Sequence, residues 1–112
     1  MGQNLIYFWQ PFYSDFKAKA AGVATRQGLT VSDSCSGAGV IFVDATRTAI
    51  FVRDARNHNG QAVIVALISS IDDSEKERQC LECGATMMEC IPSTTEDIEA
   101  LILRVKEYHS SR

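Results

Sequence analysis

The sequence lacks several features that would point to particular classes of protein. No apolar run approaches the roughly 18 residues that a membrane span needs, so no membrane insertion is expected. No basic region precedes the first apolar stretch, so a secretory signal is not expected either. The 11 Lys and Arg against 14 Asp and Glu give a net charge of −3, which argues against the basic face of a general nucleic-acid binder. These absences predict a cytoplasmic protein with no nucleic-acid partner.

Signals for cofactors and nucleophilic chemistry are also scarce. No glycine-rich phosphate loop follows the first apolar segment, which removes support for nucleotide binding. His58 lies in an expected turn and His109 lies near the C-terminal end of the sequence. Neither has a Ser or Cys nucleophile in a supporting context, so hydrolase chemistry has little support. We therefore predict no cofactor.

The four cysteines do not supply a complete metal site. Cys80 and Cys83 have the spacing of a metal or redox pair, but no second pair and no nearby His completes a tetrahedral set. Both lie late in an expected helix. We interpret them as reduced, buried structural thiols. We expect Cys35, in a small and flexible segment, to be the most exposed and oxidisable thiol. No metal site is predicted.

The residues that are present describe one globular domain. The 112 residues suffice for a single core, and the 46% hydrophobic and 22% charged fractions are those of an ordinary folded protein. The sequence starts at an expected strand and ends on an expected helix with a short polar tail. A domain cut from a larger protein would look like this, and so would a free-standing small protein; we expect the former.

The most informative stretch is residues 39–45. Four apolar residues run from Val40 to Val43 without a break and lead into Asp44. Such a run is typical of a central strand that is buried on both faces of a parallel sheet. An acidic residue at its end points into the crevice where open α/β sheets bind their ligands. Asp44 is therefore the first candidate for a functional residue.

The remaining pattern alternates strands with helices. Runs of β-branched and aromatic residues predict strands at 5–9, 29–33, 62–68 and 86–91. Apolar residues at helical spacing predict helices over about 12–27 and 46–57, a third that opens at 72–75 and ends at Gly84, and a last one that opens at 93–96. This alternation predicts a parallel sheet with helices on both faces.

Local signals set the expected ends of these elements. Pro11 suits the start of the first helix, and residues 57–60 predict a turn. Ser74 with Glu77 forms a capping-box pattern. Residues 49–52 also fit a strand, but the helix is preferred because no Gly or Asn supplies a tight hairpin. One apolar stripe follows the last helix, formed by Ile98, Leu101, Ile102, Val105 and Tyr108.

The pattern resembles the receiver domain of response regulators, the CheY-like family. Residues 62–69 resemble the fourth receiver strand with its terminal hydroxyl residue, and residues 81–85 resemble the Gly-Ala end of the helix that follows. Residues 86–92 resemble the fifth strand and its proline, and residues 40–44 resemble the third strand with its phosphoacceptor. The resemblance implies a doubly wound, flavodoxin-like sheet of five parallel strands in the order 2-1-3-4-5.

The positions that carry receiver chemistry depart from the family pattern. The resemblance makes Asp44 the candidate phosphoacceptor and Ser69 the candidate switch hydroxyl. The acidic pair that holds the divalent cation falls on Trp9 and Gln10. The family's lysine falls on Ile91, and its switch aromatic on Met88.

These departures weaken the chemistry for a physical reason. Mg²⁺ prefers carboxylate and water oxygens, and each lost electrostatic stabiliser costs about 3–4 kcal/mol in the transition state. We therefore predict a degenerate pseudo-receiver without Mg-dependent phosphoryl transfer. We expect Asp44 to be a solvent-exposed relic and Trp9 to lie near the sheet's carboxyl edge, where its indole fills the former metal pocket. The alternative is an unusual but active phosphoacceptor that uses Asp44.

A second alternative is a sensor of a small anion such as cyclic di-GMP. Arg47, Arg53 and Arg56 form the candidate anion-binding cluster, since guanidinium groups suit phosphates. The preferred interpretation of these arginines is a solvated helix face.

The connection before the central strand departs from the family as well. Residues 34–39 span at most about 20 Å when fully extended, yet they must cross the first strand. A helix does not fit into this length. We predict that the second receiver helix is missing and is replaced by an extended crossover.

The resemblance implies signalling in a two-component or phosphorelay protein, for example a hybrid sensor histidine kinase. Receivers bind partners through their fourth helix, fifth strand and fifth helix. Here that face includes the helices at 75–82 and 96–108. The implied partners are a histidine kinase or an output domain, in cis or in trans, or a second copy in a homodimer. The domain then lies in the cytoplasm, alone or as part of a membrane-bound sensor kinase.

Overall fold

The computed structural model describes residues 4–70 and 72–111. The elements follow in the order β1 (Leu5–Trp9), α1 (Phe16–Arg26), β2 (Thr30–Val31), β3 (Val40–Asp44), α2 (Ile50–His58), β4 (Val63–Ile68), α3 (Ser74–Cys83), β5 (Met87–Cys90) and α4 (Thr95–Ser110). In the described residues no helix is long and apolar enough to cross a membrane.

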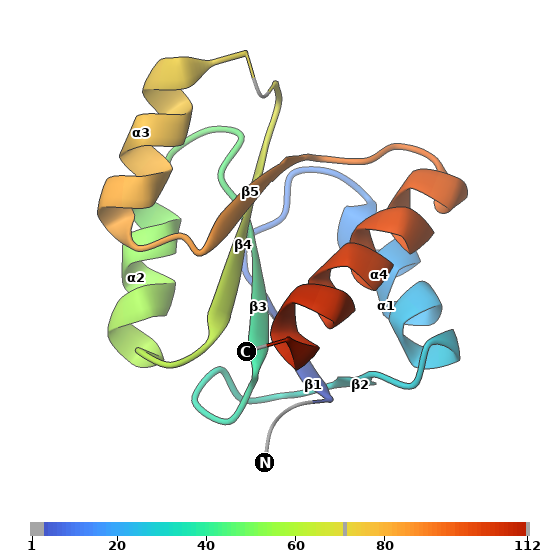
Figure 1. Cartoon of the computed structure of the whole chain (residues 1–112). Coiled ribbons are helices and arrows are strands. Elements are labelled where there is room, and N and C mark those ends of the chain that lie inside the picture. Colours follow the sequence, from blue (N-terminus) through green and yellow to red (C-terminus); the bar gives the residue numbers. More distant parts are fainter. Residues whose placement is uncertain (1–3, 71, 112) are drawn as a thin grey trace.

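The five strands form one parallel sheet in the order β2-β1-β3-β4-β5, as predicted (Figure 1). β3 is the central strand of the sheet, and all five of its residues are therefore buried. Its last residue, Asp44, is paired with Leu67 of β4, and the preceding Val43 is paired with Trp9 of β1. The sheet therefore places Asp44 at its carboxyl edge, as the sequence indicates.

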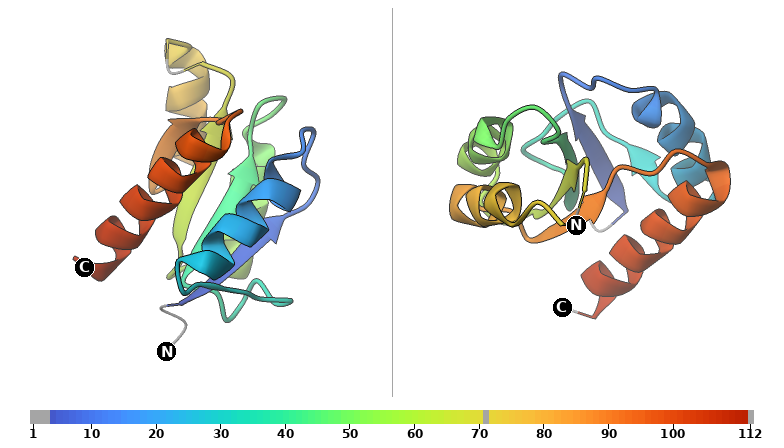
Figure 2. Two further views of the ribbon diagram at one scale, coloured as in Figure 1. Left: turned by 90° about the vertical axis from the view of Figure 1, so that its right-hand side faces the viewer. Right: turned by 90° about the horizontal axis from the view of Figure 1, so that it is seen from above.

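Two layers of helices cover the sheet. Seen from above in Figure 2, α2 and α3 lie on one face, and α1 and α4 lie on the other. Side chains alternate along β3, so Phe42 packs towards α1 and α4, whereas Ile41 and Val43 pack towards α2 and α3. The unbroken apolar run of β3 follows from this burial on both faces.

The crossover from β2 to β3 has no helix, which confirms the prediction for residues 34–39. Asn59 holds the crossover instead. Its Nδ2 donates to the carbonyls of Cys35 at 2.9 Å and Ala38 at 3.0 Å. Without a covering helix, Tyr7 and Trp9 of β1 stay half-buried on this face. The sequence predicted a turn at Asn59, but gave no signal for its role as an anchor.

Several element ends differ from the predictions. β2 spans only Thr30–Val31 of the predicted 29–33, and α2 begins at Ile50 rather than at 46, because the N–H of Thr46 bonds to Asp44 in the loop before it. α1 begins at Phe16 rather than near Phe12, because residues 10–15 form a loop in which the N–H of Tyr13 bonds to Asp44. α2 is a helix, as preferred, but it continues to His58, so the turn predicted at 57–60 starts too early. His58 lies in the last turn of that helix, where its Nδ1 contacts the Asp54 carbonyl.

The caps and the stripe of the later helices also needed correction. Asp73, not Ser74, caps α3, because its carboxylate accepts the N–H of Lys76 at 3.0 Å. Thr94 caps α4 within the predicted segment. The α4 stripe is buried except for Tyr108, which is 41% exposed.

Gly84 ends α3 with a φ of 109°, the left-handed conformation that favours glycine. A Cβ at this position would lie 2.9 Å from Cγ of Arg56. The sequence predicted this end correctly, because Gly is the common residue after a helix.

Candidate functional site at the carboxyl edge

Asp44 is buried, with 1% of its surface exposed. The expectation of a solvent-exposed carboxylate is therefore wrong. The reason is the loop after β1: residues 10–15 fold over the end of β3 instead of continuing into α1. A buried carboxylate needs hydrogen-bond donors, and the loop supplies one of them.

Both oxygens of Asp44 accept hydrogen bonds. Oδ2 accepts the N–H of Tyr13 at 2.9 Å. Oδ1 accepts the N–H of Thr46 at 3.0 Å and the Thr46 hydroxyl at 2.6 Å. Hydrogen bonds to an ionised group are about twice as strong as neutral ones, so the carboxylate ties the β1–α1 loop to the β3–α2 loop. Its visible role is structural.

This arrangement hinders nucleophilic chemistry at Asp44. A carboxylate that attacks phosphorus needs an oxygen with a free approach path. The Asp44 side chain is almost fully covered. Thr46 bonds only to Oδ1, and the N–H of Tyr13 occupies the other oxygen, Oδ2. Transfer would require the β1–α1 loop to move away first.

The residues that the receiver resemblance assigns to a metal site do not fit magnesium. Trp9 is half-buried and Gln10 is exposed, so an indole and an amide stand where the family has carboxylates. The ring contacts of Trp9 are with Tyr7 at 6.2 Å and His58 at 5.2 Å between centroids. These contacts place the indole on the α2 side of the sheet. Among the described residues, no group of three His, Cys, Asp or Glu could hold a metal ion.

The other receiver positions are also apolar or apart from Asp44. Ile91 packs against the core on the α1 and α4 side, and Met88 packs against the core on the α2 and α3 side. Ser69 is exposed just after β4. In the part of the chain that the structure describes, no hydrogen bond joins its hydroxyl to Asp44.

The three candidate arginines do not converge on one site. The Arg47 guanidinium lies 3.9 Å from the ring centroid of Tyr13. Arg53 lines a hollow between α2 and α3, next to Glu82 and Cys83. Arg56 lies at the other end of α2. This dispersal does not favour a shared anion site.

Arg56 instead joins three backbone segments. Its Nε and Nη2 donate to the Gly84 carbonyl at 3.0 and 2.9 Å, and its Nη1 donates to the Ala62 carbonyl at 2.9 Å. Nη2 also donates to the Thr86 hydroxyl at 3.2 Å. The fixed fork of the guanidinium suits several carbonyls at once. The only sequence signal for this role was the glycine at position 84.

The thiols differ in exposure from the prediction. Cys80 is buried and Cys83 is half-buried, but Cys90 is the exposed cysteine and Cys35 is half-buried. Cys35 is covered because Asn59 holds the crossover against the sheet. Burial raises the pKa of the Cys80 and Cys35 thiols, which keeps both in the neutral form.

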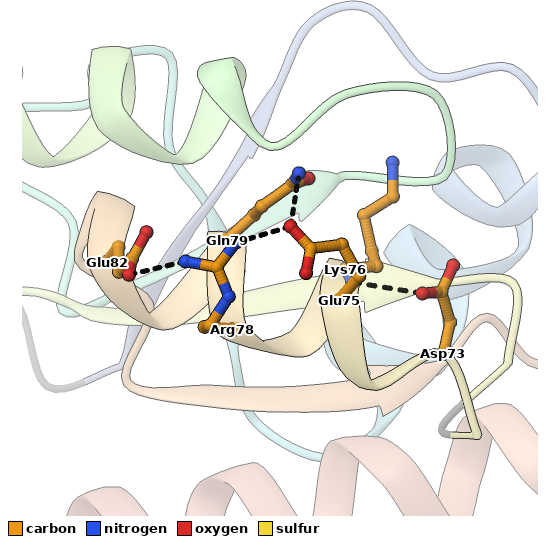
Figure 3. Close-up of polar contacts among 6 residues, drawn as sticks. All are labelled: Asp73, Glu75, Lys76, Arg78, Gln79 and Glu82. Carbon is orange, nitrogen blue, oxygen red and sulfur yellow. Dashed lines mark hydrogen bonds and ion pairs between the residues drawn. The ribbon is translucent and has the colours of Figure 1, made fainter.

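Charged side chains form most of the exposed surface of α3 (Figure 3), although Leu81 is also 55% exposed. Arg78 forms ion pairs with Glu75 one turn before it and with Glu82 one turn after it, the latter at 2.7 Å. On the neighbouring element, Glu89 of β5 pairs with Arg104 of α4 at 2.8 Å. This face is therefore dense in alternating charge.

Comparisons with known proteins support the fold. No family model matches the sequence, and no curated protein sequence matches it. Among solved structures, the chain resembles the orphan response regulator HP1043 of H. pylori, with a TM-score of 0.72 and 18% identity over 96% of this chain and 97% of that one. It also resembles a response regulator from Thermotoga maritima (TM-score 0.67, 11% identity, 92% and 97% covered). A CheY-like protein, TadZ of Pseudomonas aeruginosa, gives a TM-score of 0.61 and 13% identity, with 92% and 93% covered. The chain has the CheY-like fold.

Proposed function

We propose that this chain is a pseudo-receiver, a signalling module of a two-component or phosphorelay protein that acts by protein–protein contact without Mg-dependent phosphoryl transfer. The CheY-like fold and the response regulators among its structural neighbours support a receiver origin. A domain of a larger signalling protein, such as a hybrid sensor histidine kinase, fits this role.

The observation that carries the proposal is the burial of Asp44 beneath the β1–α1 loop. Tyr13 and Thr46 supply three hydrogen bonds to the carboxylate. Trp9 and Gln10 provide no carboxylate for a cation, and Ile91 provides no positive charge. Phosphoryl transfer is catalysed chiefly by such charges and by positioning, so little catalytic power is left.

The test is incubation with acetyl phosphate and Mg²⁺, followed by intact-mass measurement. We expect no adduct, while an ordinary receiver treated in parallel gains one phosphoryl group. Asp44→Asn is the matched control. An adduct on the wild-type chain that Asp44→Asn abolishes would instead establish the active phosphoacceptor.

The proposed contact surface consists of α3, β5 and α4. Its partner is a histidine kinase, an output domain or a second copy of the chain. The alternating charges of Glu75, Arg78, Glu82, Glu89 and Arg104 give such a surface electrostatic selectivity.

Charge reversal tests this surface. The double variant Glu82→Lys, Arg104→Glu should weaken self-association in sedimentation experiments and binding to the neighbouring domains of the full-length protein. Lys19→Glu on α1 is the control, since Lys19 is exposed outside the surface. Unchanged binding by the double variant would contradict the proposed surface.

A further inference from the structure

A cavity of about 260 Å³ lies at the amino edge of the sheet, the edge opposite to Asp44. Leu29, Val40 and Val105 form its apolar lining, and all three are buried. Asn4, Lys106, His109 and Ser110 supply the polar lining. Figure 1 shows the last turn of α4 at the same end of the molecule as the start of β1 and β2. The cavity is therefore separate from the candidate site described above.

His109 is the unusual member of this lining. Both of its ring nitrogens are buried, and neither has a hydrogen-bond partner among the described residues. Buried polar atoms are paired in the great majority of cases, and leaving one unpaired destabilises the fold. An imidazole offers a donor and an acceptor, or two donors when protonated. His109 is part of the cavity wall, so a polar ligand group becomes a suitable partner once the imidazole turns one of its buried nitrogens towards the cavity.

Lys106 determines the charge that suits the cavity. Its Nζ donates to the backbone carbonyl of Gln27 at 2.7 Å, which leaves further N–H donors on the same ammonium group. Gln27 is also the second residue with a buried, unpartnered side-chain atom, its Oε1. In the described part of the chain, the buried side-chain atoms without a partner belong to Gln27 and His109. Lys106 bonds to the backbone of Gln27 and precedes His109 by three residues in α4.

The partial charges of the helix ends at this edge do not cancel the positive charge of Lys106. The carbonyl ends of α1 and α4 carry partial negative charge, which disfavours an anion. Lys106 neutralises the end of α1 at Gln27. Ser111 donates to the carbonyls of Glu107 and Tyr108 at the end of α4. The remaining charged group in the lining is cationic.

We propose that this cavity binds a small amphipathic anion. Its acidic group contacts Lys106 and His109, and a short apolar part lies on Leu29, Val40 and Val105. A carboxylate and a phosphate monoester share this chemistry. The volume admits a ligand of a few carbon atoms, at the small end of natural ligand pockets. The proposal does not rest on the pseudo-receiver function.

The test is NMR titration of the full chain with linear carboxylates of increasing length, from acetate through butanoate to hexanoate. Backbone amides of Leu29, Val40 and Val105 and the ring nitrogens of His109 should shift together. Each added methylene should tighten binding about fourfold until the cavity is full, because each buried CH₂ contributes a nearly constant amount. Hexyl phosphate, run in parallel, distinguishes a phosphate site from a carboxylate site.

Two comparisons distinguish an anion-binding cavity from one that binds any apolar ligand of the right size. Hexan-1-ol should bind about tenfold more weakly than hexanoate, and Lys106→Met should lose a similar factor for hexanoate. Lys19→Met, which removes an exposed charge on α1, should leave affinity unchanged. His109→Gln should also weaken binding of hexanoate. Circular dichroism verifies the fold of Lys106→Met and His109→Gln. Equal binding of the alcohol and the acid, or shifts confined to residues outside the cavity, would overturn the proposal.

Discussion

The backbone N–H of Tyr13 donates to Oδ2 of Asp44 at 2.9 Å, although 31 positions separate the two residues. This bond joins the loop after β1 to the end of the central strand. It also occupies one oxygen of the carboxylate whose counterpart accepts phosphate in receivers. In this chain the carboxylate holds a loop.

Removing the Asp44 carboxylate should destabilise the fold. Asp44→Ala leaves the N–H groups of Tyr13 and Thr46 without their acceptor in a buried site, so we expect a loss of about 2–4 kcal/mol. Asp44→Asn keeps one acceptor oxygen and should lose less. Urea denaturation at neutral pH measures both. A loss below about 0.5 kcal/mol for Asp44→Ala would show that the carboxylate does not hold the loop.

Asn59 should be needed to order the crossover. Its Nδ2 donates to the carbonyls of Cys35 and Ala38, while its Oδ1 accepts the N–H groups of Gln61 and Ala62. Asn59→Asp keeps the acceptor but sets a negative charge against carbonyl oxygens. We therefore expect Asn59→Asp to be at least as destabilising as Asn59→Ala, by about 1–3 kcal/mol.

Alkylation of Cys35 provides a local readout for the same variants. The thiol is half-buried in the anchored crossover, and it should react faster once the anchor is lost. Cys90 is the internal reference, because it is exposed at the opposite edge of the sheet. A constant ratio of the two rates would contradict the anchoring role.

Arg56 and Gly84 should be coupled. Gly84→Ala forces a left-handed backbone on alanine and sets its Cβ 2.9 Å from Cγ of Arg56, so it should cost more than about 1 kcal/mol. Arg56→Ala removes the contact with Cγ along with the hydrogen bonds, and leaves only the contact with Cβ at 3.2 Å. In a double-mutant cycle, the Gly84→Ala cost should therefore shrink when Arg56 is already alanine. Strict additivity would contradict the close contact.

Cys80 should make the fold sensitive to alkaline pH. Burial raises the pKa of its thiol above the ordinary value of 9.0, an effect that nearby Lys76 partly opposes. A raised pKa in the folded state gives stability that is fully present below the ordinary pKa and is lost as pH rises through the folded value. The difference in unfolding free energy between wild type and Cys80→Ala should therefore narrow above about pH 9. A difference independent of pH would contradict the shift.

The sheet and its missing helix were predictable because they depend on spacing. The eight residues between β2 and β3, six of them outside the predicted strands, are too few to hold a helix and also cross β1, whatever their identity. The burial of Val40 to Val43 followed from their apolar character alone. These features depend on chain length and hydrophobicity, which a single sequence contains.

The surroundings of Asp44 and Arg56 were not predictable in the same way. Asp44 is covered because residues 10–15 adopt a particular loop, and no periodic pattern specifies it. Apart from the Thr86 hydroxyl, the acceptors of Arg56 described above are backbone carbonyls, which every residue carries. Sequence therefore indicated the positions of these side chains but not their partners.

The brevity of β2 has a further consequence. An edge strand offers unpaired N–H and C=O groups to any other chain, and long flat edges promote aggregation. β2 has only two residues, and its Val31 is 38% exposed. No helix follows it to cover a longer edge on the face that carries α2 and α3. The absence of the helix and the shortness of β2 are therefore related. A two-residue edge is too short to pair stably with a strand of another chain.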